Sequence, residues 1–298
     1  MLTDAIVHPE ALVKKSILLL CLAIVVALWV VFYPFWPGQY DGLAVALSMS
    51  MQVAGWVGLF LLTPIGLLWL AHELRRGAAL SRGATATDRS RVFAIAACIA
   101  SVAVAGSAAA FAVEESGFAL AIILLALWGA TVARCLRSAR AGNGGSRGLR
   151  LAPLYLIVLP ALIVVARVSF VEQAAESSRI RVIAACGSYI ADIEAYREAH
   201  GRYPVSVASL NPDYPTRTVG VDRFRYEPAG DAYNVWFEHV SSRFDVNEIV
   251  VYNPRDEQQA TSHDADILQF SLERLNQTRG YFAVYEAGVS HWKVFLFD

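Results

Sequence analysis

The sequence predicts a multi-pass α-helical membrane protein in which five transmembrane helices precede one extramembrane α+β domain. Two observations indicate this fold class. Hydrophobic residues make up 56% of the 298 residues and charged residues only 17%, whereas charged residues are about a quarter of an ordinary soluble protein. The apolar residues are also concentrated in five long stretches that end at residue 171, and a polar tail, residues 172 to 298, follows them.

The first apolar stretch, residues 16 to 36, is predicted to be a transmembrane helix that stays in the protein. It is long enough to cross about 30 Å of hydrocarbon as a helix, and Lys14 and Lys15 precede it. A secretory signal has a shorter apolar core and a small-residue cleavage site. This stretch ends instead in Phe35 and Trp36, aromatic residues that are typical of the membrane interface.

Four further apolar stretches are predicted to span the membrane. They cover about residues 43 to 70, 92 to 113, 118 to 133 and 151 to 171. Pro64 and Pro160 predict kinks in the second and fifth helices, where neighbouring helices must satisfy the freed backbone groups. Small residues recur every fourth position from Ala97 to Ala109 and favour close packing of the third helix. Polar residues of the second stretch are expected to bond between helices: Ser48, Ser50, Gln52 and Thr63.

Arginine residues between the apolar stretches predict the orientation of the chain. The loops 72 to 91 and 134 to 150 carry five arginines each, whereas the other two connections carry Asp41 or the pair Glu114 and Glu115. By the positive-inside rule the N-terminus and both arginine-rich loops are cytoplasmic, and the tail is outside. Binding of anionic lipid or nucleic acid is the alternative interpretation. The arginines lie among Gly, Ser and Ala without interleaved aromatic residues, which favours topology.

A glycine-rich linker, residues 141 to 148, divides the chain into two predicted domains. Residues 1 to 150 form a four-span membrane domain, and residues 151 to 298 form the fifth helix and an extracytoplasmic domain. Through residue 171 there are 13 Lys/Arg and 7 Asp/Glu, and the tail holds 12 and 19, so charges of +6 and −7 are segregated. The acidic tail argues against a nucleic-acid partner. Arginine predominates over lysine, as in GC-rich bacterial genomes, so the bacterial inner membrane is the expected location.

The tail is predicted to begin as a continuation of the fifth helix and to end as an antiparallel sheet. Apolar residues keep helical spacing over Ile183, Cys186, Ile190, Ile193 and Tyr196. Gly201 then supplies a helix stop. Alternating residues on both sides of the turn at 228 to 231 predict a β-hairpin. The expected strands cover residues 224 to 227, 232 to 238, 247 to 252, 281 to 286 and 291 to 297.

A short motif lies at the end of this predicted helix: Tyr196, Gly201, the pair Tyr203-Pro204 and Leu210. It resembles a motif of type II secretion pseudopilins and related type IV pilin-like proteins. The resemblance implies a periplasmic domain whose long N-terminal helix packs on an antiparallel sheet. Pilins carry a cleavage site just before that helix, whereas Gly148, Leu149 and Arg150 precede the fifth stretch here. Processing and assembly into a fibre are therefore not expected.

The sequence predicts no catalytic, cofactor-binding or metal-binding residues. His72-Glu73 begins like the HExxH motif of zinc proteases, but Arg76 stands where the second histidine is required. The four cysteines have no metal-type spacing. Ser262, His263 and Asp264 have the residue types of a hydrolase, but adjacent residues do not form a triad, and a loop or a helix N-cap at Asp264 or Asp266 is favoured. We therefore expect a protein that is not an enzyme.

Trp236 is the candidate contact residue of the tail. In a strand, Tyr233, Val235 and Phe237 share one face and Trp236 lies on the other. Packing in a core or at an edge is favoured for Trp236 because aromatic residues are common in strands. Binding of a partner protein or a saccharide is the alternative.

Two classes of function are compatible with this organisation. The first is a non-enzymatic envelope protein whose outer domain contacts an unidentified protein partner or detects a ligand. The second is a membrane-embedded transporter or enzyme with an accessory outer domain. Such chemistry usually needs ionisable residues at membrane depth, and Arg167 alone lies inside the predicted spans. The first class is therefore favoured.

Overall fold

A computed structural model describes residues 9–83, 85, 87–141, 152–207, 214–243, 246–258 and 281–297 of the chain. The chain forms two compact units. The first, here called the helical unit, consists of Met1–Phe32 and Val45–Phe170, and the second consists of Tyr33–Ala44 and Val171–Asp298. The second unit, here called the C-terminal unit, therefore combines the tail with a connection from near the start of the chain.

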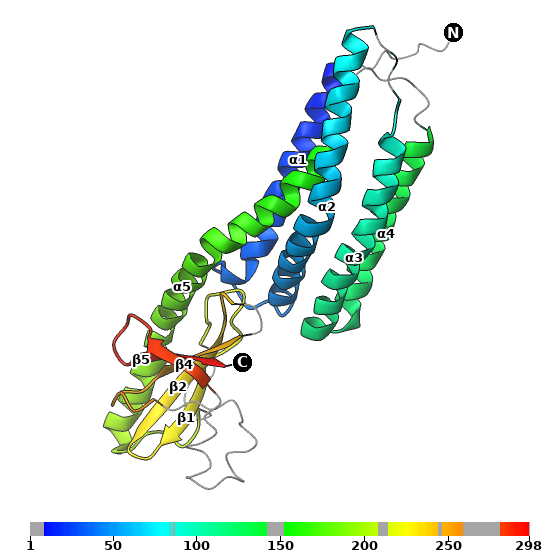
Figure 1. The fold of residues 1–298 in the computed structure, drawn as a ribbon. Helices are drawn as coiled ribbons and strands as arrows, with labels where there is room; N and C mark the ends of the chain where they lie inside the picture. The colour runs from blue at the N-terminus through cyan, green and yellow to red at the C-terminus, as the bar shows by residue number, and fades with distance from the viewer. Residues whose placement is uncertain are drawn as a thin grey trace. The chain divides into compact units, whose positions relative to one another are not determined.

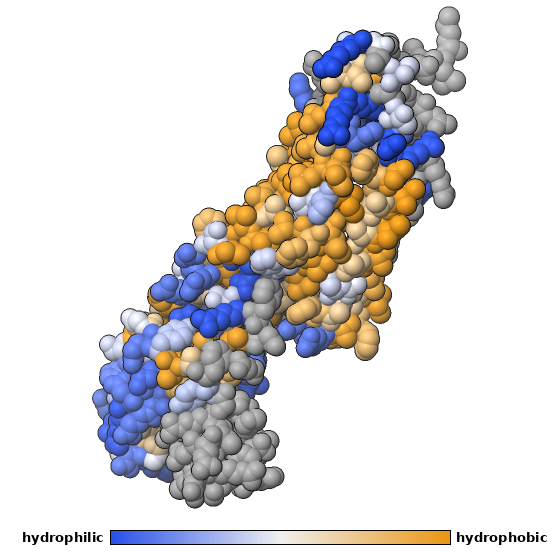
Figure 2. Space-filling model, in the orientation of Figure 1, coloured by the Kyte–Doolittle hydropathy of each residue, from blue (hydrophilic) through white to orange (hydrophobic). Residues whose placement is uncertain are grey.

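Five α-helices make up the described part of the helical unit (Figure 1). They are α1 (Pro9–Phe32), α2 (Ala44–Ser81), α3 (Ser90–Ser116), α4 (Phe118–Ala141) and the first part of α5 (Ala152–His200). Within the described residues, four segments are long and apolar enough to cross a membrane: Lys14–Phe35, Ala44–Ser81, Ser90–Ser116 and Ala152–His200. The apolar segment of α4, Phe118–Arg134, is shorter. Hydrophobic residues gather over the visible face of these helices in Figure 2.

A glycine of α2 allows α5 to approach closely. A Cβ atom at Gly66 would lie 3.0 Å from the carbonyl oxygen of Pro153, so a larger residue has no room there. Close by, the hydroxyl of Thr63 donates to the carbonyl oxygen of Leu156 at 3.4 Å. This bond confirms that Thr63 connects two helices, as expected from the sequence.

Polar residues near the start of α2 behave in different ways. The hydroxyl of Ser48 donates to the carbonyl oxygen of Val31 on α1 at 2.6 Å, so its expected interhelical bond is confirmed. The amide of Gln52 instead donates to Ser48 within its own helix at 2.9 Å. The hydroxyl of Ser50 is buried, and no described residue bonds to it. The expected interhelical bonds of Gln52 and Ser50 are therefore not found among the described residues.

Helices α3 and α4 pack through the small residues that the sequence placed on one face of α3. The buried cluster contains Ala109 and Ala112 of α3 together with Leu120 and Ala121 of α4. Further along the same pair of helices, the indole N–H of Trp128 donates to the hydroxyl of Ser101 at 3.0 Å. Of the recurring small residues, Ser101 and Ala109 thus serve helix packing.

In the described residues, the sheet of the C-terminal unit has five antiparallel strands in the order β1-β2-β3-β5-β4. Their bounds are β1 (Arg225–Ala229), β2 (Ala232–Val240), β3 (Asn247–Tyr252), β4 (Tyr281–Glu286) and β5 (Trp292–Phe297). These bounds confirm all five strands expected from the sequence. The β1–β2 hairpin closes through Gly230, whose φ of +60° is favourable for glycine.

Helix α5 covers one face of this sheet. The residues of α5 that belong to the core under the sheet are Val182, Ile183, Cys186, Tyr189 and Ile193, and they share this core with Tyr233, Val235, Phe237, Val250, Val294 and Leu296 of the sheet. Ile190 lies at the margin of this core, half-buried. The helix ends at His200, and Gly201 with φ +69° donates its N–H to Arg197 at 2.8 Å. One uninterrupted helix from the fifth apolar stretch to His200 is therefore confirmed.

Residues Tyr33–Ala44, here called the strap, connect α1 to α2 and belong to the C-terminal unit. The strap forms a short antiparallel bridge between Pro37 and Thr218. Around it, Val219 N–H donates to Trp36 O at 3.0 Å, and Gly220 N–H donates to Pro34 O at 2.8 Å. The strap is thus bonded by main-chain groups to a segment far along the sequence.

Candidate functional site

A buried polar network lies between α5 and the sheet. His239 on β2 and Glu248 on β3 are cross-strand partners, and both side chains face α5 because Phe237 and Val250, two positions along each strand, belong to the core under that helix. His239 Nδ1 lies 3.0 Å from Glu248 Oε1, and His239 Nε2 lies 2.8 Å from Ser178 Oγ. We call Ser178, Arg179, His239 and Glu248 the His239 network.

Arg179 supplies the positive charge of this network. Its Nε–H donates to Glu248 Oε1 at 2.7 Å, and its guanidinium also lies over the ring of Tyr285 on β4, 5.7 Å from the centroid. Burial acts to raise the pKa of Glu248, but the hydrogen bonds and charges of His239 and Arg179 outweigh burial and lower that pKa below its ordinary value. The carboxylate is therefore held in its charged form.

The order Ser178, His239, Glu248 is the order of side chains in a serine hydrolase triad. The exposed fractions of these three residues are 0%, 5% and 3%. Ser178 lies in the middle of α5, and its hydroxyl also bonds to the carbonyl oxygen of Ala175 at 2.8 Å. A nucleophile must reach its substrate, and this hydroxyl is enclosed by the core. The network acts in this structure as a polar joint between helix and sheet.

The strap lies against this joint. The ring of Phe35 is 6.5 Å from the ring of His239, centroid to centroid. Arg181, on the next part of α5, donates from Nη1 to the carbonyl oxygen of Phe35 at 3.0 Å. The strap therefore contacts the rest of the C-terminal unit through its main chain and through the ring of Phe35 beside His239.

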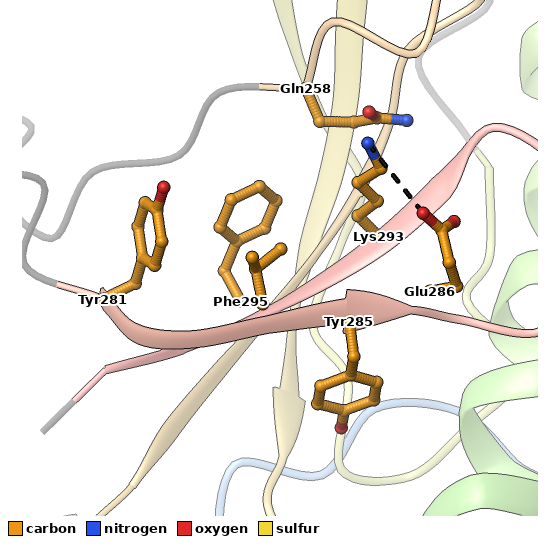
Figure 3. A pocket seen from close by; sticks show the side chains of 7 residues that line it. Gln258, Tyr281, Tyr285, Glu286, Lys293 and Phe295 are labelled. Carbon is orange, nitrogen blue, oxygen red and sulfur yellow. Dashed lines mark ion pairs between the residues drawn. The ribbon is translucent and has the colours of Figure 1, made fainter.

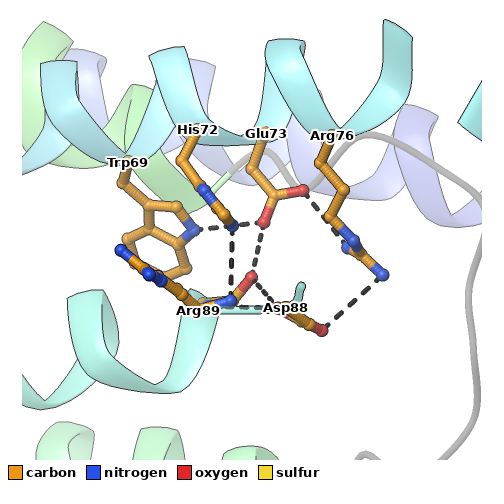
Figure 4. Close-up of polar contacts among 7 residues, drawn as sticks. Trp69, His72, Glu73, Arg76, Asp88 and Arg89 are labelled. Carbon is orange, nitrogen blue, oxygen red and sulfur yellow. Dashed lines mark hydrogen bonds and ion pairs between the residues drawn. The ribbon is translucent and has the colours of Figure 1, made fainter. Parts of the chain in front are cut away.

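A second polar cluster joins α2 to the start of α3 (Figure 4). Glu73, 3% exposed, accepts hydrogen bonds from Trp69 Nε1 at 3.2 Å and from Ser90 Oγ at 2.6 Å. Arg76 lies 3.6 Å from both Glu73 and Asp88. Arg76, which replaces the second histidine of an HExxH motif, is thus an ion-pair partner of the glutamate. No group of three or more potential metal ligands occurs in the described part of the chain.

A cavity of about 260 Å³ lies on the outer part of the sheet, at β4 and β5 (Figure 3). Tyr281 and Phe295 contribute aromatic walls, and Lys293 and Glu286 form an ion pair of 3.9 Å at its side. Gln258 lines it as well. Tyr285 lines it too, and the Tyr285 ring also contacts Arg179 of the His239 network.

Trp236 is half-buried on the sheet face opposite α5. Its ring lies under the guanidinium of Arg225, 4.6 Å from the centroid, and packs against the cluster of Val251, Phe295 and Phe297. Most of the Trp236 side chain is therefore packed against neighbouring residues, which is the role that the sequence favoured. The residues Ser262, His263, Asp264 and Asp266 lie outside the described residues.

Comparisons with known proteins give no match: no family model, no curated protein and no solved structure is similar to this chain. Neither His239 nor Glu248 was singled out from the sequence. The register of β2 and β3 pairs His239 with Glu248. Val240 lies opposite Asn247, so the residues one step further into the two strands, His239 and Glu248, lie opposite each other.

Proposed function

We propose that the protein is a five-span protein of the bacterial inner membrane whose C-terminal domain lies outside. This domain acts without catalysis, by contact with another envelope protein or by detecting a ligand. The observation that carries the proposal is the strap, a connection between two apolar helices that is packed into the C-terminal unit.

The position of the strap in the C-terminal unit supports a protein with five spans, because it limits how many times the chain crosses the membrane. Residues 33–44 and 171–298 belong to one compact unit, so they lie on one side of the membrane. The chain between them must then cross the bilayer an even number of times. Helices α2, α3 and α5 give an odd number, so α4 has to cross as well. Its 24 residues reach about 36 Å at 1.5 Å per residue.

Charge supports the outer position of this unit. The strap contains no lysine or arginine, and the tail is acidic. The loops at the opposite ends of α2, α3, α4 and α5 contain the two groups of five arginines. By the positive-inside rule, these loops are cytoplasmic and the strap with the tail is periplasmic.

The pilin-like motif and the helix on the sheet support a pseudopilin-like domain. We propose that this domain does not assemble into a fibre as pilins do. The chain connects this domain to the membrane helices at three points: the end of α1, the start of α2 and the part of α5 that precedes Val171. Extraction into a fibre would pull apolar helices from the lipid and expose their apolar side chains to water, which is costly. A domain anchored in this way is suited to contact within the envelope.

In-cell photocrosslinking tests contact by the outer domain. A photoreactive residue at Trp236 or Val284 in the full chain is expected to capture one discrete envelope protein. The matched control carries the same residue at Ile122, which is 64% exposed on α4 and faces lipid in this proposal. Capture of the same protein from all three positions would contradict specific contact. Sheared filaments that contain the chain, or cleavage at residue 150, would overturn the proposal.

A further inference from the structure

We propose that the outer edge of β4 binds an extended, basic segment of a partner protein as an added strand of the sheet. This inference deepens the proposed function and depends on it, because it names the surface and the chemistry of the contact.

The two edge strands differ in their ability to accept another strand. The sheet order places β1 at one edge and β4 at the other, and in the described residues each pairs on one side alone. Strand β1 contains Pro228, which has no N–H to donate. Proline on an edge strand is a common protection against unwanted pairing. Strand β4 contains no proline, so its edge is able to continue the ladder.

The register identifies the backbone groups that point outward. Ala287 N–H donates to Trp292 O at 3.0 Å, so this is a hydrogen-bonded pair. Such pairs alternate along an antiparallel ladder, and Tyr285 opposite Val294 is the next one. The N–H and C=O groups of Val284 and Glu286 therefore point away from β5. Val284 is 46% exposed, so this part of the edge is open to a partner.

The cavity beside this edge can receive a side chain of the added strand. Tyr281, Val284, Glu286 and Phe295 line it on the side of β4 and β5 (Figure 3). In strand addition, main-chain bonds supply affinity and pockets for alternate side chains supply selectivity. An aliphatic or aromatic side chain fits the walls formed by Tyr281 and Phe295.

Charge selects a basic partner over a second copy of this chain. The tail has 19 acidic and 12 basic residues, so two copies joined edge to edge would bring two acidic domains together. Opposite charge favours encounter and like charge disfavours it. Glu286 lies on the edge itself, with its side chain 72% exposed and 3.9 Å from Lys293, and in the complex it would bind a lysine or arginine of the added strand as well.

A binding experiment with the full-length protein in detergent micelles tests this surface. The probe is a short fluorescein-labelled peptide with the repeat Val-Thr-Lys-Thr, which places valine and lysine in turn on one face of a strand, and fluorescence anisotropy measures its affinity. Val284→Pro removes an outward N–H while leaving the β4–β5 ladder in place, and it is expected to weaken binding by about tenfold or more. Val284→Ala keeps the N–H and is expected to retain the affinity within about twofold.

Three outcomes would overturn the edge as the binding site. These are equal binding by wild type and Val284→Pro, equal binding of a peptide with glutamate in place of lysine, and a dimer in light scattering that Val284→Pro dissociates. The last outcome would identify a second copy as the occupant. If in-cell capture persists in Val284→Pro, the contact lies elsewhere and the proposed function stands. If neither Trp236 nor Val284 captures a protein in cells, the proposed function itself fails.

Discussion

The backbone N–H of Val219 donates a 3.0 Å hydrogen bond to the carbonyl oxygen of Trp36, and this bond joins the strap to the rest of the C-terminal unit. The next residue, Gly220, has no room for a side chain, because a Cβ atom would lie 2.8 Å from Pro34 O.

Gly220→Ala is expected to destabilise the C-terminal unit by about 1 to 3 kcal/mol, the usual cost of overpacking. Thermal unfolding of the purified full-length protein measures this loss. Gly187→Ala is the matched control, since nothing lies within 4 Å of a Cβ there and alanine is favourable in a helix. A similar loss in both variants would show that the strap contact contributes nothing.

Cysteine labelling tests the orientation. In intact cells, a membrane-impermeant maleimide should label Tyr40→Cys in the strap and Arg202→Cys in the tail, because both side chains are exposed in one compact unit. Arg82→Cys should react after permeabilisation alone. Labelling of Tyr40→Cys and Arg202→Cys from opposite sides would contradict the strap, and labelling of both from the cytoplasm would reverse the orientation.

Glu248 should make the C-terminal unit sensitive to acid. Its pKa is lowered in the folded protein, so its contribution is present above the unfolded-state pKa and is lost as pH falls through the folded-state pKa. Glu248→Gln leaves Arg179 without its buried carboxylate and should cost about 3 to 5 kcal/mol at neutral pH. The difference from wild type should shrink below about pH 4.5. A difference that stays constant with pH would exclude this role.

The core face of α5 is open to a direct test. Ile193 is fully buried against the sheet, so Ile193→Asp should cost more than about 4 kcal/mol by burying a charge without a partner. Ile190→Asp should cost less, because Ile190 is half-buried. Ala195→Asp, on the exposed side of the helix, should leave thermal unfolding nearly unchanged, and equal losses in all three variants would contradict this orientation of the helix.

Local sequence patterns predicted the secondary structure well. Strand β3 matches its expected bounds at Asn247 and Tyr252, because its apolar residues stand between polar turns. Hydropathy was less informative about where helices end. Helix α2 continues through Arg75 and Arg76 to Ser81, although the loop was expected to begin at residue 72, because hydropathy locates the bilayer and not the last helical turn.

The polar joint and the strap could not be predicted from local pattern. Ser178 approaches His239 because α5 crosses the sheet at one position, and that position depends on the packing of the whole core. Pro37 meets Thr218 through main-chain groups, which every residue carries. Neither contact can be recognised from the residue types of the two segments that form it.

The bridge between Pro37 and Thr218 also sets an order of events during synthesis. The strap leaves the ribosome early, whereas its partner segment follows four more helices. Contacts between distant parts of a chain form slowly, because the intervening loop must first be closed. The C-terminal unit therefore completes its fold only after the tail has been synthesised, and until then the main-chain donors and acceptors of the strap lack the partners that they have in the folded unit.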